Sequence, residues 1–373
     1  MSKYHYILIF ILISSFGCQK EQDTLEGLVD ATAHEDEFFD KQLSFLDKLV
    51  SNDPDNPALY FSRGSVQLRK KEYGSALENA EKAIQIDSTN GEFYFLSASS
   101  HYFLGNMRSA ILNGEKAIRL GYKHPHLKTF IGASFNNLEQ PDSALFYLKS
   151  SILEVPQNNM TYRSIGKSYA LKGDFARSLK NYRKSIEILP TDTMSYVGII
   201  EQSIKSKNIP LAKETLTIAM GLQLKSTAIN YENAYLLASE GLIDSAIVIH
   251  QTILKEKPTY WKSSKELGRL YRKKRLPLEA NRVFLEGLKL DPEIKELWYE
   301  LGLTQQYFFK NYTEAKKDFE KALDIDPLYK DAKVALSNLR ATLRRLYAPP
   351  VITTDESSET ESQAIDDDDG LSL

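Results

Sequence analysis

The chain of 373 residues is poor in cysteine and has no large excess of either charge. Its single cysteine excludes an internal disulfide framework, a CxxC redox pair and a cysteine-rich zinc site. With 47 Lys and Arg against 50 Asp and Glu, the formal net charge of -3 gives no reason to expect nucleic acid as a partner. A content of 42% hydrophobic and 26% charged residues is that of a globular protein, not of a disordered chain or a multi-span membrane protein.

Sequence motifs of catalysis are also missing. The sequence has no Gly-x-Ser-x-Gly elbow and no glycine loop that would cradle a phosphate. His124 and His126 lie close together, but the 6 histidines show no metal-ligand spacing, and satisfied or exposed imidazoles are expected instead of a metal site. We therefore expect a protein that is not an enzyme and that needs no cofactor.

Long hydrophobic runs are absent except at the start of the chain, where Tyr4 to Gly17 carry no charge. About 14 residues rise only roughly 21 Å as a helix, short of the ~20 residues that a membrane span needs. This length is typical of the apolar core of a signal peptide, and we assign residues 1–17 to one.

The Gly17-Cys18 pair at the end of this run resembles the processing site of bacterial lipoproteins. The resemblance implies that Cys18 becomes the lipidated first residue and anchors the chain to a membrane, with residues 18–36 as a linker. Gln19 rather than Asp after the cysteine resembles sorting to an outer membrane. The alternative is an ordinary secretory signal with an incidental cysteine.

The main feature of the sequence is a repeat of 34 residues, marked by columns of small side chains. The first column is Gly64, Ala98, Gly132, Gly166, Ile200, Ala234, Gly268 and Gly302. The second is Ala76, Ala110, Ala144, Ser178, Ala212, Ala246, Ala280 and, after a one-residue insertion near Asn311, Ala315. Two helices approach closely only where neither carries bulk, so each repeat is predicted to be a hairpin of two amphipathic helices.

The last full repeat resembles the tetratricopeptide repeat family in Trp298, Leu301, Gly302, Ala315, Phe319, Ala322 and Pro327. The resemblance implies an all-α fold, a right-handed α-solenoid or superhelix of helical hairpins, with eight repeats over residues 57–329. Departures from the pattern concentrate in the fifth and sixth repeats, where Ile200 and Ile253 replace small residues.

The array is expected to be closed at both ends by amphipathic helices. Residues 37–56 form a partial repeat at the N-terminal end, and residues 330–348 form a capping helix at the C-terminal end, because end repeats must not leave an open apolar face. Residues 349–373 contain eight acids and no base, and are predicted to be a disordered acidic tail.

In the family, the first helix of each repeat lines a concave groove that binds protein or peptide segments. The matching positions in this chain include an aromatic group in the first two repeats and cations further on. The predicted groove residues are Phe61, Phe95, Tyr102, Phe103, Arg163, Lys167, Tyr231, Tyr235, Lys262, Lys265, Arg269, Arg272, Lys273 and Tyr299. The alternative for an aromatic side chain is core packing, and for the cations it is a solvated helix face.

The cations suit carboxylates, for which arginine supplies bidentate hydrogen bonds, so we expect acidic partners among the ligands. Gly198 and Glu300 stand where a chaperone-tail clamp of the family needs Asn, which argues against that adaptor role. A further hypothesis is that the tail aspartates 366–369 dock on the cations of the seventh repeat and compete with an acidic partner.

These expectations combine into a lipid-anchored scaffold that binds proteins through its groove at the envelope of a bacterium, on the outer membrane. The alternatives are a substrate-capturing or regulatory component of a secretion or outer-membrane assembly machine and, less favoured, a hydrolase with a site in the groove. RNA binding, known in related helical repeats, is disfavoured by the export signal. Partner identity, membrane face and oligomeric state do not follow from the sequence.

Overall fold

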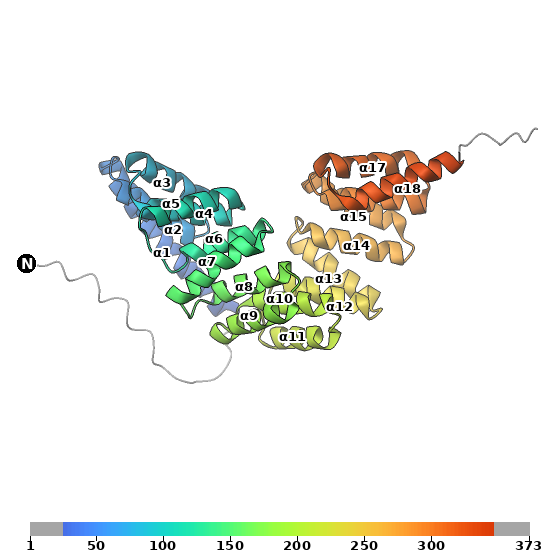
Figure 1. The fold of residues 1–373 in the computed structure, drawn as a ribbon, viewed down its shortest axis with the longest axis horizontal. Helices are drawn as coiled ribbons and strands as arrows, with labels where there is room; N and C mark the ends of the chain where they lie inside the picture. Colours follow the sequence, from blue (N-terminus) through green and yellow to red (C-terminus); the bar gives the residue numbers. More distant parts are fainter. Residues whose placement is uncertain (1–24, 347–373) are drawn as a thin grey trace, which may run out of the picture. The chain divides into compact units, whose positions relative to one another are not determined.

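In the computed structural model, the described part of the chain runs from residue 25 to residue 346, with side chains described from residue 36. Helices joined by short turns make up all of it (Figure 1). It divides into two compact units, unit 1 up to residue 225 and unit 2 from residue 226. The all-α solenoid of helical hairpins predicted from the sequence is confirmed.

Unit 1 consists of one long helix followed by helical hairpins. Its helices are α1 (Leu25–Asn52), α2 (Pro57–Arg69), α3 (Tyr73–Ile86), α4 (Gly91–Phe103), α5 (Met107–Arg119), α6 (Leu127–Asn137), α7 (Pro141–Glu154), α8 (Asn159–Leu171), α9 (Phe175–Ile188), α10 (Thr193–Lys205) and α11 (Ile209–Gly221).

Unit 2 continues the same alternation and ends in a single helix. Its helices are α12 (Thr227–Ser239), α13 (Ile243–Glu256), α14 (Trp261–Lys273), α15 (Pro277–Leu290), α16 (Lys295–Thr304), a π-helical turn η1 (Gln305–Phe309), α17 (Tyr312–Ile325) and α18 (Lys330–Leu346). The first helices begin at the first residue of each predicted repeat, except in the third, where α6 begins at Leu127.

The first helix is longer than the sequence analysis predicted. We expected a linker up to residue 36 and a cap over residues 37–56, whereas α1 begins at Leu25 and ends at Asn52. No proline interrupts residues 25–52, and the segment contains five Leu and three Glu, which favour helix. Phe39 and Val50 of α1 are buried against the array, and Phe38 and Phe45 are exposed.

The small-residue columns lie where helices cross. The alanines and the serine of the second column are all buried, with Ala76, Ala144 and Ala280 at 0% exposure. At Gly268 an added Cβ atom would lie 2.2 Å from the ring of Phe284, itself fully buried. The close approach of paired helices therefore depends on the absence of side chains, and the bulk beside each crossing comes from the partner helix.

The structure shows how the insertion in the last repeat is accommodated. We expected it near Asn311, and the extra residue lies in the π-helical turn η1, which is closed by a hydrogen bond from the Asn311 amide to the Gln305 carbonyl. A π-turn absorbs one residue without changing the direction of the helix. Helix α17 therefore still presents Ala315 and Phe319, both fully buried, to its partner helix.

The turn inside each hairpin contains one residue in the left-handed region at a fixed repeat position. These residues are Lys71, Gly105, Glu139, Gly173, Lys207, Gly241, Arg275 and Lys310. Glycine adopts this conformation without strain, whereas the other five residues have a Cβ atom that crowds the backbone. The turn therefore keeps the same left-handed backbone conformation in every repeat, even where the residue at this position is not glycine.

Candidate functional site

Four aromatic rings on the first helices of the second and third repeats form one group in unit 1. The Tyr102 ring lies 5.2 Å from Phe103 and 5.1 Å from Phe130, measured between centroids, and Phe103 lies 5.7 Å from Phe130. Phe95 joins the group at 6.2 Å from Phe130. We call these four residues, with His124 and His126, the aromatic surface.

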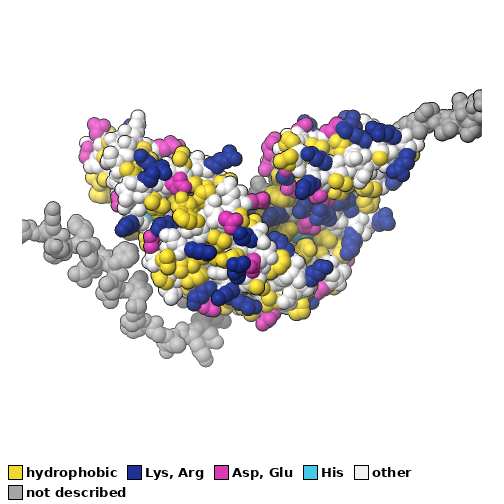
Figure 2. All heavy atoms as spheres, in the orientation of Figure 1, with side chains coloured by type: hydrophobic (Ala, Val, Ile, Leu, Met, Phe, Trp, Pro, Cys, Tyr) yellow, Lys and Arg dark blue, Asp and Glu magenta, His cyan; other side chains and the backbone are white. Residues whose placement is uncertain are grey.

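The aromatic surface reaches solvent although it is apolar. The Phe103 side chain is 44% exposed, and Phe95, Tyr102 and Phe130 are half-buried. Figure 2 shows hydrophobic side chains gathered over this part of unit 1. An exposed cluster of rings differs from the scattered single apolar side chains that any surface carries, and it is typical of an interaction site.

Two histidines extend the aromatic surface at the start of the third repeat. The His124 ring lies 4.0 Å from Phe95, and the His126 ring lies 6.1 Å from Phe130. Burial, with a smaller effect of His126, lowers the pKa of His124 to about 4, and burial lowers the pKa of His126. Both rings are therefore neutral at pH 7 and behave as aromatic groups.

The other groove residues predicted in unit 1 are committed to internal contacts. Phe61 packs 5.8 Å from the buried ring of Phe93 between the first two repeats. Arg163 forms an ion pair with Asp192, whose side chain is 3% exposed. Lys167 donates a hydrogen bond of 2.5 Å to the side chain of Asn137. The structure therefore brings together Phe95, Tyr102 and Phe103, but not these three residues.

In unit 2, two of the predicted cations already bind a carboxylate of the chain itself. Arg269 donates to Glu300 through Nε at 2.6 Å, and Arg272 bonds to the other oxygen of the same carboxylate. Arg272 also donates to the Glu300 carbonyl at 3.1 Å, and the Glu300 side chain is only 1% exposed. The two arginines that the sequence offered as a seat for a partner's carboxylate thus already hold a carboxylate of the chain itself, although the Arg269 side chain is still 45% exposed.

Three cations of the same stripe remain. Lys265 lies over the Trp261 ring at 5.5 Å and 3.6 Å from the Glu266 carboxylate. Lys262 is exposed, and Lys273 is exposed at the end of α14, where it lines a pocket. Figure 2 shows basic side chains gathered in this part of unit 2.

The three predicted tyrosines of unit 2 have different surroundings. Tyr231 packs edge-on against His250 at 5.6 Å, and burial raises its pKa. Tyr299 packs 6.0 Å from Phe319 and joins the core that α18 covers. Tyr235 is 39% exposed and lines the same pocket as Lys273. Only Tyr235 is therefore available to a ligand.

Sequence reasoning missed several residues of these sites. Phe130 lies at a repeat position outside the groove stripe taken from the family, and the residues at the same position of the neighbouring repeats, Leu96 and Ser164, do not signal it. Glu300 was noted only as a departure from Asn. His250 lies on a second helix, which the stripe does not include. The signal that remained was the pairing of His124 and His126 beside Phe130.

The comparisons with known proteins agree with the fold. A sequence profile of the tetratricopeptide repeat matches residues 57–90 and 295–327. Over 201 residues, half of this chain, the sequence is 23% identical to human protein O-mannosyl-transferase TMTC3, and it spans 22% of the length of that protein. The chain therefore contains tetratricopeptide repeats.

Two solved structures show the same architecture. The chain is similar to a structure of the APC/C hetero-tetramer Cut9-Hcn1, at a TM-score of 0.55 and 20% identity, covering 82% of this chain and 60% of that one. It is similar to a tetratricopeptide repeat protein from Parabacteroides merdae, at a TM-score of 0.54 and 17% identity, covering 67% and 98%. At these identities the likeness shows the fold alone.

Several predictions concern residues outside the described part of the chain. They are the signal peptide over residues 1–17, the lipid attachment at Cys18 and the acidic tail over residues 349–373. Within the described helices, none combines the length and the apolar character that crossing a membrane requires.

Proposed function

We propose that the chain is a non-enzymatic scaffold that binds protein partners through the first helices of its repeats. The observation that carries the proposal is the aromatic surface, a group of touching rings with Phe103 44% exposed. Buried aromatic anchors supply much of the binding energy at protein interfaces, and leaving such rings in water is unfavourable.

The form of the partner follows from the surface. The four rings come from two neighbouring first helices, α4 and α6, and offer a stacking surface to a ligand. An extended segment with apolar or aromatic side chains matches such a surface.

The location of the scaffold is part of the proposal and rests on sequence. Lipid on Cys18 would hold the chain at a bacterial outer membrane, since stable anchoring takes more than one acyl chain or signal. The test is mass spectrometry of the mature N-terminus together with phase partition in detergent. The proposal expects an acylated Cys18 and loss of the detergent-phase fraction in Cys18→Ser; an unmodified N-terminus would contradict it.

The binding function is tested by substitution at the aromatic surface. A partner recovered by cross-linking in intact cells is purified, and its dissociation constant is measured for the full chain and for Phe103→Ala/Phe130→Ala. We expect affinity to fall by about tenfold or more, because truncation of an interface aromatic costs about 1–3 kcal/mol.

A matched control comes from the second helix of the third repeat. Phe146 on α7 is 73% exposed and belongs to no group on the first helices. The affinity of Phe146→Ala should stay within about twofold of wild type, as a surface substitution away from the site should. Equal losses in both variants, or no loss in either, would contradict the proposed function.

A further inference from the structure

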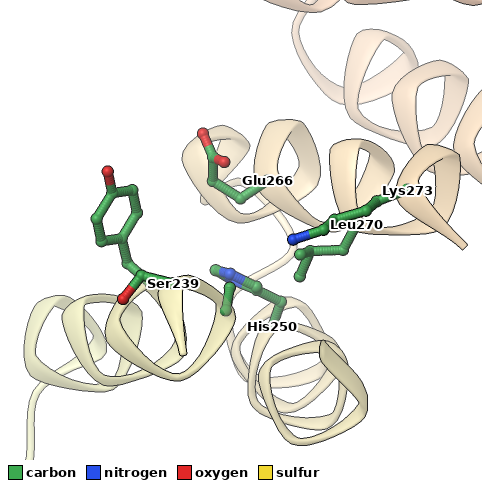
Figure 3. A pocket seen from close by; sticks show the side chains of 7 residues that line it. Ser239, His250, Glu266, Leu270 and Lys273 are labelled. Carbon is green, nitrogen blue, oxygen red and sulfur yellow. The ribbon is translucent and has the colours of Figure 1, made fainter. Parts of the chain in front are cut away.

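A pocket of about 190 Å³ in unit 2 is bounded by the first helices of two successive repeats, α12 and α14, with α13 behind them. Its lining residues are Tyr235, Ala238, Ser239, His250, Glu266, Leu270 and Lys273. Figure 3 shows Lys273 lying over Leu270 toward the His250 ring, while the Glu266 carboxylate points away from the pocket centre. A volume of this size accommodates one small side chain.

The innermost polar group of the pocket is the His250 imidazole, which is 1% exposed. Its Nδ1 lies 3.2 Å from the hydroxyl of Ser263, which is fully buried and forms its one described hydrogen bond there. In the tautomer with the imidazole proton on Nε2, Nδ1 accepts a hydrogen bond from the Ser263 hydroxyl. Burial lowers the pKa of His250 to about 4, so the ring is neutral at pH 7.

In this tautomer His250 offers an N–H donor at Nε2, and no hydrogen bond of the described residues involves that atom. The Nε2 atom is on the ring edge opposite the Ser263 contact, and the ring lines the pocket. An N–H group that lines a pocket can donate a hydrogen bond to a ligand oxygen that enters it. A ligand in the pocket is therefore expected to place a hydrogen-bond acceptor beside the His250 ring.

Lys273 supplies the charge at the mouth of the pocket. Its neighbours along the chain are paired, Arg272 with Glu300 and Lys274 with Asp244. No ion pair joins Lys273 to any acid within residues 36–346. The ammonium group is thus available to an incoming anion, at the same pocket as the His250 donor.

The one acid of the pocket does not cancel this charge. Glu266 lies 3.1 Å from Arg269 and 3.6 Å from Lys265, so its carboxylate is balanced by two cations on the same helix. The Ser239 hydroxyl proton is used by the Leu236 carbonyl at 2.6 Å, and the Tyr235 hydroxyl is a further donor among the lining residues. Donors therefore dominate the polar lining.

We propose that this pocket binds the carboxylate of an acidic side chain, with Lys273 and His250 as its two donors. The proposal rests on the proposed function, because the acidic side chain belongs to an extended segment lying on the first helices. Two sources carry this chemistry, an acidic segment of a partner and the aspartates 366–369 of the chain itself. Residues 349–373 contain eight acids and no base, and they follow α18 of the same unit.

The test uses the full-length chain and a fluorescent peptide with the sequence of residues 361–373, whose binding is measured by anisotropy at low salt. The first variant replaces the aspartates 366–369 by asparagine, so that the tail cannot compete. In that background Lys273→Ala should weaken peptide binding by about fivefold or more, since it removes a charge-assisted hydrogen bond at a partly exposed site. A peptide with four asparagines should lose affinity to the same extent.

Lys274→Ala is the matched control, because this lysine is one residue away and pairs with Asp244 outside the pocket. Its affinity should stay within about twofold of the background, as for a screened surface charge. Equal affinities of Lys273→Ala and Lys274→Ala, or no measurable peptide binding to the background variant, would overturn the proposal. A second variant, His250→Gln, should also weaken peptide binding, whereas Ser239→Ala should leave the peptide affinity close to that of the asparagine-tail variant.

The same titration identifies the source of the carboxylate. Weaker peptide binding by the wild-type chain than by the asparagine-tail variant shows that the tail occupies the pocket, and equal binding shows that the ligand comes from a partner. If Lys273→Ala does not change peptide affinity while a partner still binds the aromatic surface, the proposal for the pocket is overturned and the proposed function stands. If Lys273→Ala weakens peptide binding but substitutions at the aromatic surface leave partner binding unchanged, the proposed function is overturned and the proposal for the pocket stands.

Discussion

At the scale of single residues, Glu300 changes the meaning of the basic stripe on α14. The sequence places five cations on one face, which suggests an open seat for acids. The structure gives two of them, Arg269 and Arg272, a buried carboxylate contributed by the next repeat. At these two positions the stripe of like charge therefore forms ion pairs between successive repeats. Of the five cations, only Lys273 at the end of the stripe lines the pocket.

Replacement of Glu300 tests whether these ion pairs stabilise the contact between the repeats. Glu300→Gln removes the charge that neutralises two arginines, and we expect the free energy of unfolding to fall by about 2–4 kcal/mol, because one partner of a buried ion pair is lost. Urea denaturation of the full chain measures the change. Glu286→Gln, at an exposed pair with Arg282, is the control and should change stability by less than about 0.5 kcal/mol.

Asp318 carries an unfavourable charge in the last repeat. Its Oδ2 atom is buried without a hydrogen-bond partner among the described residues, and burial raises its pKa to about 7. Asn79, Asn113 and Asn181 occupy the same repeat position, and each donates from its side chain to the carbonyl four residues earlier. An asparagine at position 318 would have the Glu314 carbonyl as its acceptor.

We therefore predict that Asp318→Asn stabilises the protein at high pH. The folded-state pKa lies above the ordinary value of 3.8, so the wild type loses stability as pH rises from about 4 through 7. The variant should be more stable by about 1–3 kcal/mol at pH 8 and nearly equal to wild type at about pH 3, where Asp318 is mostly protonated in both states. Thermal unfolding at the two pH values measures this, and a gain that is independent of pH would contradict it.

At the scale of elements, the helical hairpin is set by the crossing of its helices and by the turn between them. Gly268 lies against the Phe284 ring, so Gly268→Ala should destabilise the protein by about 1–3 kcal/mol through overpacking, despite the higher helix propensity of alanine. Gly74→Ala is the control, since an added Cβ atom there meets nothing within 4 Å. Chemical denaturation of both variants checks the prediction, and equal effects would refute it.

The left-handed position in the turn of each hairpin allows two substitutions with opposite expected effects on stability. Glu139 has a φ of 56°, and Glu139→Gly should stabilise the protein by about 0.5–1 kcal/mol, because the strain of the left-handed conformation exceeds the entropy cost of glycine. Gly105 has a φ of 84° with open space around its Cβ position, so Gly105→Ala should destabilise by about 1 kcal/mol through strain alone. Melting temperatures that move in the same direction in both variants would contradict this account.

At the scale of the whole molecule, the period of 34 residues predicted most of the fold. Ala76, Ala144 and Ala280 are buried as the columns required, and α2 and α16 begin where the repeats were placed. The start of α1 and the π-turn η1 were not predictable from the period, because both concern residues outside the regular pattern.

The candidate sites were less predictable than the fold, for a physical reason. Phe95, Tyr102 and Phe103 were identified from their repeat positions, but Phe61 and Tyr299 share such positions and pack against the core rings of Phe93 and Phe319. Whether a ring or a cation is free depends on what the next repeat places against it, as Glu300 does for Arg272. Those contacts join residues about 30 positions apart, and the stripe of one helix does not contain them.

Photo-cross-linking in intact cells tests most directly the central claim, that protein partners bind the first-helix face. A photoreactive phenylalanine analogue at position 103 should give a discrete cross-linked product that disappears in Phe130→Ala, while the same analogue at position 146, on the exposed second helix α7, should give none. The same product from both positions, or none from position 103, would contradict the account.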